Sequence, residues 1–247
     1  MYFRNNPFFK MKSFLALSAT LATATAFVAP QAARTVSSLN AGKDDLIALA
    51  EKANPIVKFW DPTGLAEKEF YEWDNDRTIS FLRHSEIKHG RIAMFAFVGY
   101  CVQSNFHFPW AQSLNGDMFP STDLSPEAQW DAFPVEGKQQ IFAVIAAMEI
   151  WDECGGGGAF DHYTRGRQPG KYPPFEAFRE DVHFVLDLYD PFGLNKKMTD
   201  ETKERRLVAE INNGRLAMLG IFGFLCADTI PGSVPALAGI AIPYEGN

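Results

Sequence analysis

The chain has 247 residues, 47% of them hydrophobic and 14% aromatic, which is enough for one or two domains with a substantial core and excludes disorder over most of its length. Residues 1–40 hold four basic residues and no acid, so the remainder holds 19 basic and 30 acidic residues. This acidic body argues against a nucleic-acid partner, and three cysteines without a C-x-x-C spacing indicate neither a disulfide framework nor a zinc site.

The first forty residues form a predicted targeting sequence. A basic start at Lys10 and Lys12 precedes a short apolar run that ends in A-T-A-F, which predicts a signal peptide over 1–27. Residues 28–40 are rich in Ser and Ala, contain one Arg and lack acids, as transit segments do. The two in series resemble the bipartite plastid presequence of algae with secondary plastids, and the alternative is an ordinary secreted protein.

Three helical segments follow, at about 78–103, 137–152 and 199–228, and we expect them to cross a membrane. Lys and Arg are absent between residues 103 and 137 and after Arg215, whereas residues 43–83 carry six and residues 152–206 carry nine. The positive-inside rule then predicts three spans, with the N-terminus and the 152–206 loop on the stromal side. Loop 104–136 and the C-terminal tail would face the lumen.

Two parts of the chain repeat each other. The sequence E-I-K-H-G-R-I-A-M at 86–94 matches E-I-N-N-G-R-L-A-M at 210–218, and each follows a D-P-x-G-L stretch, at 61–65 and 190–194. Pro presets φ and Gly takes a positive φ, so each D-P-x-G-L predicts a turn. Two such units that enter from one side can pack about a pseudo-twofold axis.

The charges of the repeat predict two ion pairs between the helices. Arg91 lies five residues after Glu86, about 140° around a helix, so the two cannot easily pair within the same helix. Reciprocal packing instead pairs Arg91 with Glu210 and Arg215 with Glu86, while small residues let the helices approach closely. The alternative is local pairing, Glu86 with Arg83 and Glu210 with Arg206.

The remaining polar residues of the repeat have the chemistry of metal ligands. Glu86 and His89 share a helix face, as do Glu210 and Asn213. A carboxylate that one Arg neutralises still has a free oxygen, and an imidazole or amide lies one turn further on. Each is a plausible axial ligand for a magnesium held by a tetrapyrrole, which needs one hard N or O donor.

These motifs carry a resemblance to a known family. The presequence, both D-P-x-G-L turns, E-x-x-H-G-R, E-x-N-N-G-R and the ending I-P-G-S-V-P-A-L at 230–237 resemble the chlorophyll a/b- and a/c-binding light-harvesting proteins. The ending and the presequence are closest to the fucoxanthin–chlorophyll a/c-binding proteins of diatoms and related algae. The resemblance covers nearly the whole predicted mature chain, 41–247.

The resemblance implies an all-α membrane protein with three transmembrane helices, the first and third crossed, plus short amphipathic surface helices. It implies that the Glu, His and Asn of the motifs bind chlorophyll, that Arg91 and Arg215 lock the crossing, and that carotenoids lie near the D-P-x-G-L segments. Gln140 and Glu149 match ligand positions of the middle helix. Related antenna proteins often have a His or Gln ligand fourteen residues after Asn213, but this chain has Ala227 there, which cannot bind a metal. Either Asp228 or water replaces that ligand, or the corresponding pigment is absent.

The function implied is a light-harvesting antenna, not an enzyme, in the plastid thylakoid membrane. Its expected cofactors are chlorophyll a, chlorophyll c, fucoxanthin and a diadinoxanthin-type carotenoid. Its expected partners are other antenna subunits, thylakoid lipids and a photosystem core, with a lean to photosystem I. The alternatives are a photoprotective, energy-dissipating member of the same family and a structural linker within a photosystem supercomplex.

A di-iron carboxylate enzyme is the alternative from a different class. Its helices carry E-x-x-H, which occurs here as Glu86/His89 and as Glu180/His183. Asn213 stands where iron would want His, and the segment around Glu180 is more typical of an amphipathic surface helix. The run G-G-G-G at 155–158 lacks the Lys-Ser/Thr of a phosphate loop, and we expect a flexible link there.

Overall fold

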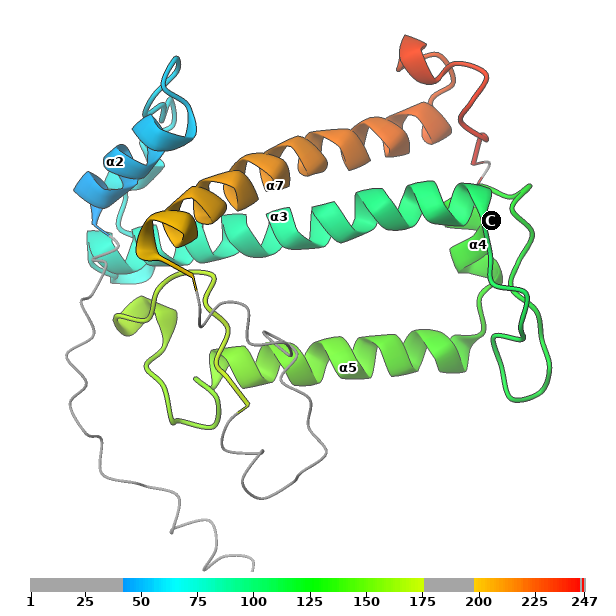
Figure 1. The fold of residues 1–247 in the computed structure, drawn as a ribbon, viewed down its shortest axis with the longest axis horizontal. Helices are drawn as coiled ribbons and strands as arrows, with labels where there is room; N and C mark the ends of the chain where they lie inside the picture. The colour runs from blue at the N-terminus through cyan, green and yellow to red at the C-terminus, as the bar shows by residue number, and fades with distance from the viewer. Residues whose placement is uncertain (1–41, 176–197, 245, 247) are drawn as a thin grey trace, which may run out of the picture. The chain divides into compact units, whose positions relative to one another are not determined.

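The computed structural model describes residues 42–175, 198–244 and 246, which lie within the unit Ser38–Asn247 (Figure 1). These residues form helices and turns, and no strand occurs among them, so the all-helical fold is confirmed for this part of the chain. The predicted presequence, the second D-P-x-G-L segment at 190–194 and the pair Glu180/His183 lie outside the described residues.

The helices follow the order expected from the sequence. Helices α3, α5 and α7 begin and end within three residues of the predicted segments at 78–103, 137–152 and 199–228. The described elements are α2 Lys43–Ala53, η1 Leu65–Glu67, η2 Phe70–Glu72, α3 Asn75–Asn105, α4 Pro126–Ala132, α5 Val135–Glu153, η3 Tyr163–Arg165, α7 Asp200–Thr229 and η5 Pro235–Leu237.

Local chemistry explains where these helices start. The Thr199 hydroxyl accepts a hydrogen bond from the Thr202 amide and so caps α7, whose first turn carries Asp200 and Glu201. Carboxylates in the first turn stabilise a helix, because they lie near the positive end of its dipole. In α4, the Ser125 hydroxyl caps the Ala128 amide, and a proline follows the cap, where its missing N–H costs nothing.

The first D-P-x-G-L segment forms the predicted turn. The Asp61 carboxylate accepts hydrogen bonds from the backbone amides of Leu65, at 3.0 Å, and Ala66, at 2.8 Å. Gly64 has φ of 65°, the left-handed conformation for which glycine was expected. These bonds close the chain over residues 61–66 just before it enters α3, and they lower the pKa of Asp61.

Helices α3 and α7 pack against each other, and this crossing is the centre of the fold (Figure 1). At the closest approach the two backbones touch through Gly90 and Gly214, both buried. A Cβ atom added to Gly90 would lie 3.0 Å from the Gly214 Cα, and the reverse distance is 2.9 Å. The contact is reciprocal, as a pseudo-twofold arrangement of the repeats requires.

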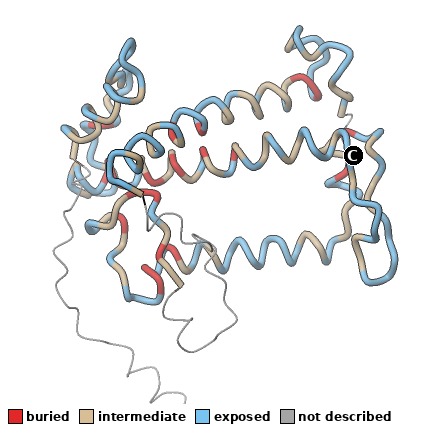
Figure 2. The backbone as a smooth tube through the Cα atoms, viewed as in Figure 1, coloured by how far each residue is buried: buried red, intermediate tan, exposed pale blue. Residues whose placement is uncertain are grey.

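Buried residues gather near this crossing and at the chain that follows α5, while most of the helical surface is exposed (Figure 2). Large apolar side chains of α3 and α7 point away from the crossing, among them Phe95, 78% exposed, and Leu219, 71% exposed. In α5 the apolar residues Phe142, Val144 and Ile145 are all exposed. In the part of the chain that the structure describes, none of the helices combines the length and the apolar character needed to cross a membrane.

The glycine run after α5 is a hydrogen-bonded turn, so the expectation of a flexible link was wrong. Gly155 to Gly158 all have positive φ, between 59° and 86°. Their amides donate to the last carbonyls of α5, from Gly155 to Asp152 and from Gly156 to Trp151. Four successive left-handed residues strongly favour glycine, and the turn sends the chain back toward α3.

The crossing predicts a steric effect of Gly214→Ala. The new methyl group would press on the Gly90 backbone, which cannot move away without separating the helices. We expect a loss of about 1–3 kcal/mol in the free energy of unfolding, seen as a lower thermal midpoint by circular dichroism.

Gly223→Ala is the matched control, because it lies in the same helix and a Cβ there meets nothing within 4 Å. It should keep or raise the midpoint by the gain in helix propensity, up to about 1 kcal/mol. Equal midpoints for the two variants would contradict close packing at the crossing.

Candidate functional site

Two ion pairs join α3 and α7 on either side of the glycine contact. Arg91 Nε donates to Glu210 Oε1 at 2.6 Å, and Arg215 Nε donates to Glu86 Oε1 at 2.7 Å. Both predicted pairs are confirmed, and the alternative of local pairing with Arg83 and Arg206 is wrong. We call these four residues the clamp.

Each clamp glutamate uses one oxygen for its arginine and keeps the other. Among the described residues, nothing donates a hydrogen bond to Oε2 of Glu86 or Glu210. The carboxylates are between one quarter and one third exposed. The arginine therefore neutralises the carboxylate without consuming its capacity to bind a cationic metal centre.

His89 and Asn213 are also open to a ligand. His89 Nδ1 lies 2.8 Å from the Ser85 carbonyl, which only accepts hydrogen bonds, so Nδ1 carries the proton and Nε2 keeps its lone pair. The ring is exposed, and a backbone acceptor on one nitrogen is the usual way a metal-binding histidine is oriented. The Asn213 amide is exposed, whereas its neighbour Asn212 donates to the Ala53 carbonyl at 2.9 Å.

The two candidates of the middle helix differ from each other. Gln140 is exposed on α5. Glu149 is exposed too, but its Oε2 lies 2.7 Å from the Nζ of Lys88, a residue of α3. The two clamp glutamates, the two α5 residues, His89 and Asn213 together offer six candidate metal ligands on three helices, and none of these side chains is buried.

The structure also holds a buried charge cluster that sequence reasoning missed. Asp152, at the end of α5 and fully buried, pairs with Arg167 Nη2 at 2.6 Å and Lys88 Nζ at 2.7 Å. His84 Nε2 lies 3.1 Å from the same carboxylate. Because His84 Nδ1 accepts the Gly170 amide hydrogen at 3.1 Å, the Nε2 atom carries the proton and faces Asp152.

The Tyr163 ring and the Gly170 peptide lie against this cluster. The Tyr163 ring stacks on His84 with centroids 3.8 Å apart, and burial raises the pKa of Tyr163 to about 12. The Gly170 carbonyl accepts from Arg91 Nη1 at 2.5 Å. Since the Gly170 amide bonds His84 and its carbonyl bonds Arg91, one peptide segment connects the Asp152 cluster to the clamp. The only sequence signal was an aspartate placed at the end of an apolar helix.

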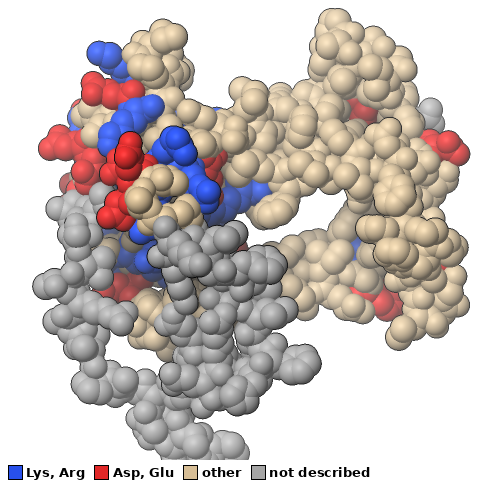
Figure 3. Space-filling model, in the orientation of Figure 1, with Lys and Arg blue, Asp and Glu red and all other residues tan. Residues whose placement is uncertain are grey.

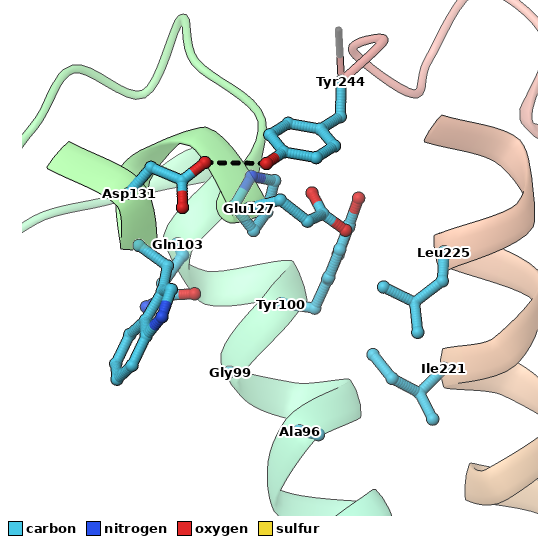
Figure 4. Close-up of a pocket in the computed structure, with 11 residues that line it drawn as sticks. Ala96, Gly99, Tyr100, Gln103, Glu127, Asp131, Ile221, Leu225 and Tyr244 are labelled. Carbon is cyan, nitrogen blue, oxygen red and sulfur yellow. Dashed lines mark hydrogen bonds between the residues drawn. The ribbon is translucent and has the colours of Figure 1, made fainter. Parts of the chain in front are cut away.

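A pocket lies on each side of the α3–α7 crossing along the helices. One, of about 530 Å³, is lined by α2, the D-P-T-G-L turn and the clamp residues Glu86 and Arg215. The other, of about 550 Å³, lies between α3, α4 and α7 and is lined mainly by apolar atoms of residues such as Tyr100, Trp130 and Leu225. Figure 4 shows Tyr244 at its rim, where the hydroxyl donates to Asp131 Oδ2 at 2.7 Å.

The position expected to lack a ligand is closed. Ala227 and Asp228 are both buried, and Asp228 is only 1% exposed. Neither carboxylate oxygen of Asp228 has a hydrogen-bond partner in the described structure. Asp228 is thus enclosed by the protein and is not open to a ligand from outside.

The clamp predicts that Arg215→Met is destabilising, because it leaves the Glu86 carboxylate without its cation. We expect a loss of roughly 1.5–3 kcal/mol in the free energy of unfolding, the usual contribution of a charged hydrogen bond. Thermal unfolding of purified protein measures it.

Arg205→Met is the control, because Arg205 is an exposed arginine of the same helix. It should leave the midpoint within about 0.5 kcal/mol of the starting protein. Adding Glu86→Gln to Arg215→Met should recover part of the loss, since no charge is then left unpaired. A midpoint for Arg215→Met equal to that of Arg205→Met would show that the pair contributes nothing.

Comparison with known proteins finds a matching family and several similar relatives. Residues 47–229 match the family described as chlorophyll A-B binding protein. A fucoxanthin-chlorophyll a-c binding protein of Trieres chinensis is 31% identical over 229 residues, which cover 90% of this chain and 97% of the relative. The fucoxanthin-chlorophyll a-c binding protein F of Phaeodactylum tricornutum is 32% identical, over 86% of this chain and 93% of the relative. The fucoxanthin-chlorophyll a-c binding protein B of Macrocystis pyrifera is 32% identical, over 70% of this chain and 68% of the relative. With a reciprocal Glu–Arg clamp and this extent of similarity, the chain belongs to the chlorophyll A-B binding family of light-harvesting proteins, which bind pigments and are not enzymes.

Proposed function

We propose that the protein is a light-harvesting antenna that binds chlorophyll a, chlorophyll c and fucoxanthin-type carotenoids and passes their excitation to a photosystem. The observation that carries the proposal is the clamp: each glutamate is neutralised by an arginine of the opposite helix and keeps one free oxygen. A purely structural ion pair does not require a spare oxygen beside an open imidazole or amide.

The six open donors are the proposed chlorophyll ligands. A magnesium tetrapyrrole takes one axial N or O donor, and each of these side chains supplies one. The clamp glutamates do so as neutralised carboxylates, His89 through Nε2, and the amides through their oxygens. The residues are Glu86, His89, Gln140, Glu149, Glu210 and Asn213, with Arg91 and Arg215 holding the two clamp glutamates.

The proposed setting is a thylakoid membrane that α3, α5 and α7 cross. The charged side chains gather around α2 and the starts of α3 and α7, while the long remainder of the helix pair is nearly free of charge (Figure 3). The charges that do interrupt α3 and α7 include Arg91 and Glu210, which neutralise each other, so they would cost little in an apolar surrounding. The Lys and Arg distribution supports a stromal N-terminus and a stromal 152–206 loop.

The exposed apolar faces support bound pigment and lipid as their covering. Monomeric soluble proteins rarely expose large contiguous apolar surfaces, and the outer faces of α3, α5 and α7 are such surfaces. The space-filling surface is hollowed between α5 and the α3–α7 pair, which leaves room for planar rings on the ligand side chains (Figure 3). The pocket of about 530 Å³ beside the D-P-T-G-L turn supports the end group of a carotenoid there.

The relatives support the choice of pigments, because all three named above are called fucoxanthin-chlorophyll a-c binding proteins. A diadinoxanthin-type carotenoid would be a further occupant of the grooves beside the crossing. Bound pigments would supply light absorption and the transfer of excitation. The protein would supply fixed positions: the clamp and the glycine contact hold α3 and α7, and the ligand side chains set where each ring lies along them.

Proposed partners are other antenna subunits, thylakoid lipids and a photosystem core, with photosystem I favoured. Loop 104–136 carries three exposed aromatic side chains: Phe108 stacks on Trp110 and meets Phe106 edge to face. Such a surface is typical of contacts with a neighbouring protein or membrane.

The decisive experiment measures energy transfer. We would purify the protein with its pigments from thylakoids and record chlorophyll a fluorescence while scanning excitation across the blue and green bands, where chlorophyll c and carotenoids absorb. Strong emission on exciting those bands would establish a transferring antenna. Bound pigments with a short-lived, quenched emission would instead identify the energy-dissipating alternative. A protein without any bound tetrapyrrole would overturn both.

Ligand assignment predicts different effects for two adjacent asparagines. Asn213→Ala should remove one chlorophyll per polypeptide on reconstitution with pigments, because the side chain that binds it is lost. Asn212→Ala is the control, since the Asn212 amide is already engaged by Ala53. Pigment extraction followed by chromatography gives the number of chlorophylls per polypeptide. An unchanged chlorophyll content in Asn213→Ala would remove that residue from the ligand set.

A further inference from the structure

A third glutamate is held as the two clamp glutamates are. Glu149 of α5 uses Oε2 to accept from Lys88 Nζ of α3 at 2.7 Å, and no described residue donates to its Oε1. In Glu86 and Glu210 one oxygen likewise faces a cation of another helix and the second is free. The cation at Glu149 is a lysine, which the repeat motif did not lead us to expect, and it comes from 61 residues earlier in the chain.

Lys88 is itself fixed from two sides. Its Nζ also lies 2.7 Å from Asp152 Oδ2, so the ammonium group bridges two carboxylates one helical turn apart. Asp152 keeps a second cation, because Arg167 Nη2 lies 2.6 Å from its other oxygen. Removing Lys88 would therefore leave Asp152 paired and Glu149 unpaired. The charge of Lys88 is needed at Glu149 more than at Asp152.

The apolar surroundings of Glu149 make the positive charge of Lys88 important for its stability. α5 exposes Ile145 and Ile150 on either side of Glu149, so pigment or lipid would cover this stretch of the helix. An uncompensated carboxylate there would be costly, because covering it with apolar groups removes an unpaired charge from water. A neutral amide at the same position would need no cation.

We propose that Lys88 is the counter-charge that makes Glu149 a chlorophyll ligand, so that the ligand on α5 depends on a residue of α3. The inference rests on the proposed pigment-binding function. It assigns Lys88 as a positioning residue: Lys88 holds the Glu149 carboxylate in one orientation, compensates its charge and does not itself touch the metal.

Reconstitution of the full chain with chlorophylls and carotenoids tests this, with chlorophyll per polypeptide and the thermal midpoint as the two readouts. Lys88→Met should lose one chlorophyll and lower the midpoint, while Lys88→Arg should keep the full complement. Lys203→Met is the matched control, because it removes an exposed lysine whose ion pair in the described structure is with Asp200, one turn away in the same helix. It should keep every pigment.

The double variant Lys88→Met/Glu149→Gln distinguishes the effect of Lys88 on Glu149 from its effect on the buried Asp152 cluster. The amide that Glu149→Gln introduces needs no counter-charge, so the missing chlorophyll should return. A Lys88→Met protein with full pigment content would overturn the proposal. So would a double variant as depleted as Lys88→Met, or one that also fails to fold, because Lys88 would then act only through Asp152. If the unaltered protein bound no chlorophyll, the proposed function itself would fail, and this inference with it.

Discussion

The pairing of Glu86 with Arg215 and of Glu210 with Arg91 is the interaction on which the rest of the structure depends. Neither clamp arginine can easily reach the glutamate of its own motif, and each reaches the glutamate of the other motif where α3 and α7 cross. The crossing in turn requires two glycines in contact, since a single added methyl group would lie about 3 Å from the opposite backbone. Arg91 then uses a second nitrogen to bond the Gly170 carbonyl, which ties the chain after α5 to the same point.

The middle helix is held in a different way. α5 meets α3 at its C-terminal end, where Asp152 is surrounded by Lys88, His84 and Arg167. The hydrogen bond from Arg167 and the nearby nitrogen atoms of Lys88 and His84 offset the cost of removing this charge from water. The apolar sides of α5 remain exposed along its length. The protein thus joins α3 to α7 around the glycine contact and the clamp, joins α5 to α3 through polar contacts at one end, and leaves much of the apolar surface of these helices for other molecules to cover.

That division explains why so little of the polypeptide is buried. The buried residues that the structure describes lie mostly near the charged end of the helices, and the long exposed faces carry Phe, Leu, Ile and Val (Figures 2 and 3). In a protein that covers these faces with pigment, the pigments complete the hydrophobic core, and the ligand side chains anchor them. The stability of such a protein would then depend on pigment binding as much as on contacts between its own residues.

The sequence by itself determined the positions of α3, α5 and α7 and the D-P-T-G-L turn, because these follow from local rules. It also determined both clamp pairs, because the repeated motif indicated that the two helices pack reciprocally. Helix periodicity, capping and turn residues act over a few neighbours, and a five-residue spacing between Glu86 and Arg91 disfavours pairing within a helix. The Asp152 cluster, the link from Lys88 to Glu149, the ordered glycine turn and the enclosed Asp228 were decided only by the tertiary structure. The groups of the Asp152 cluster come from segments up to 86 residues apart, as His84 and Gly170 are, and no sequence repeat relates those segments. No local pattern specifies which side chains meet, because the meeting depends on how the whole chain places its helices.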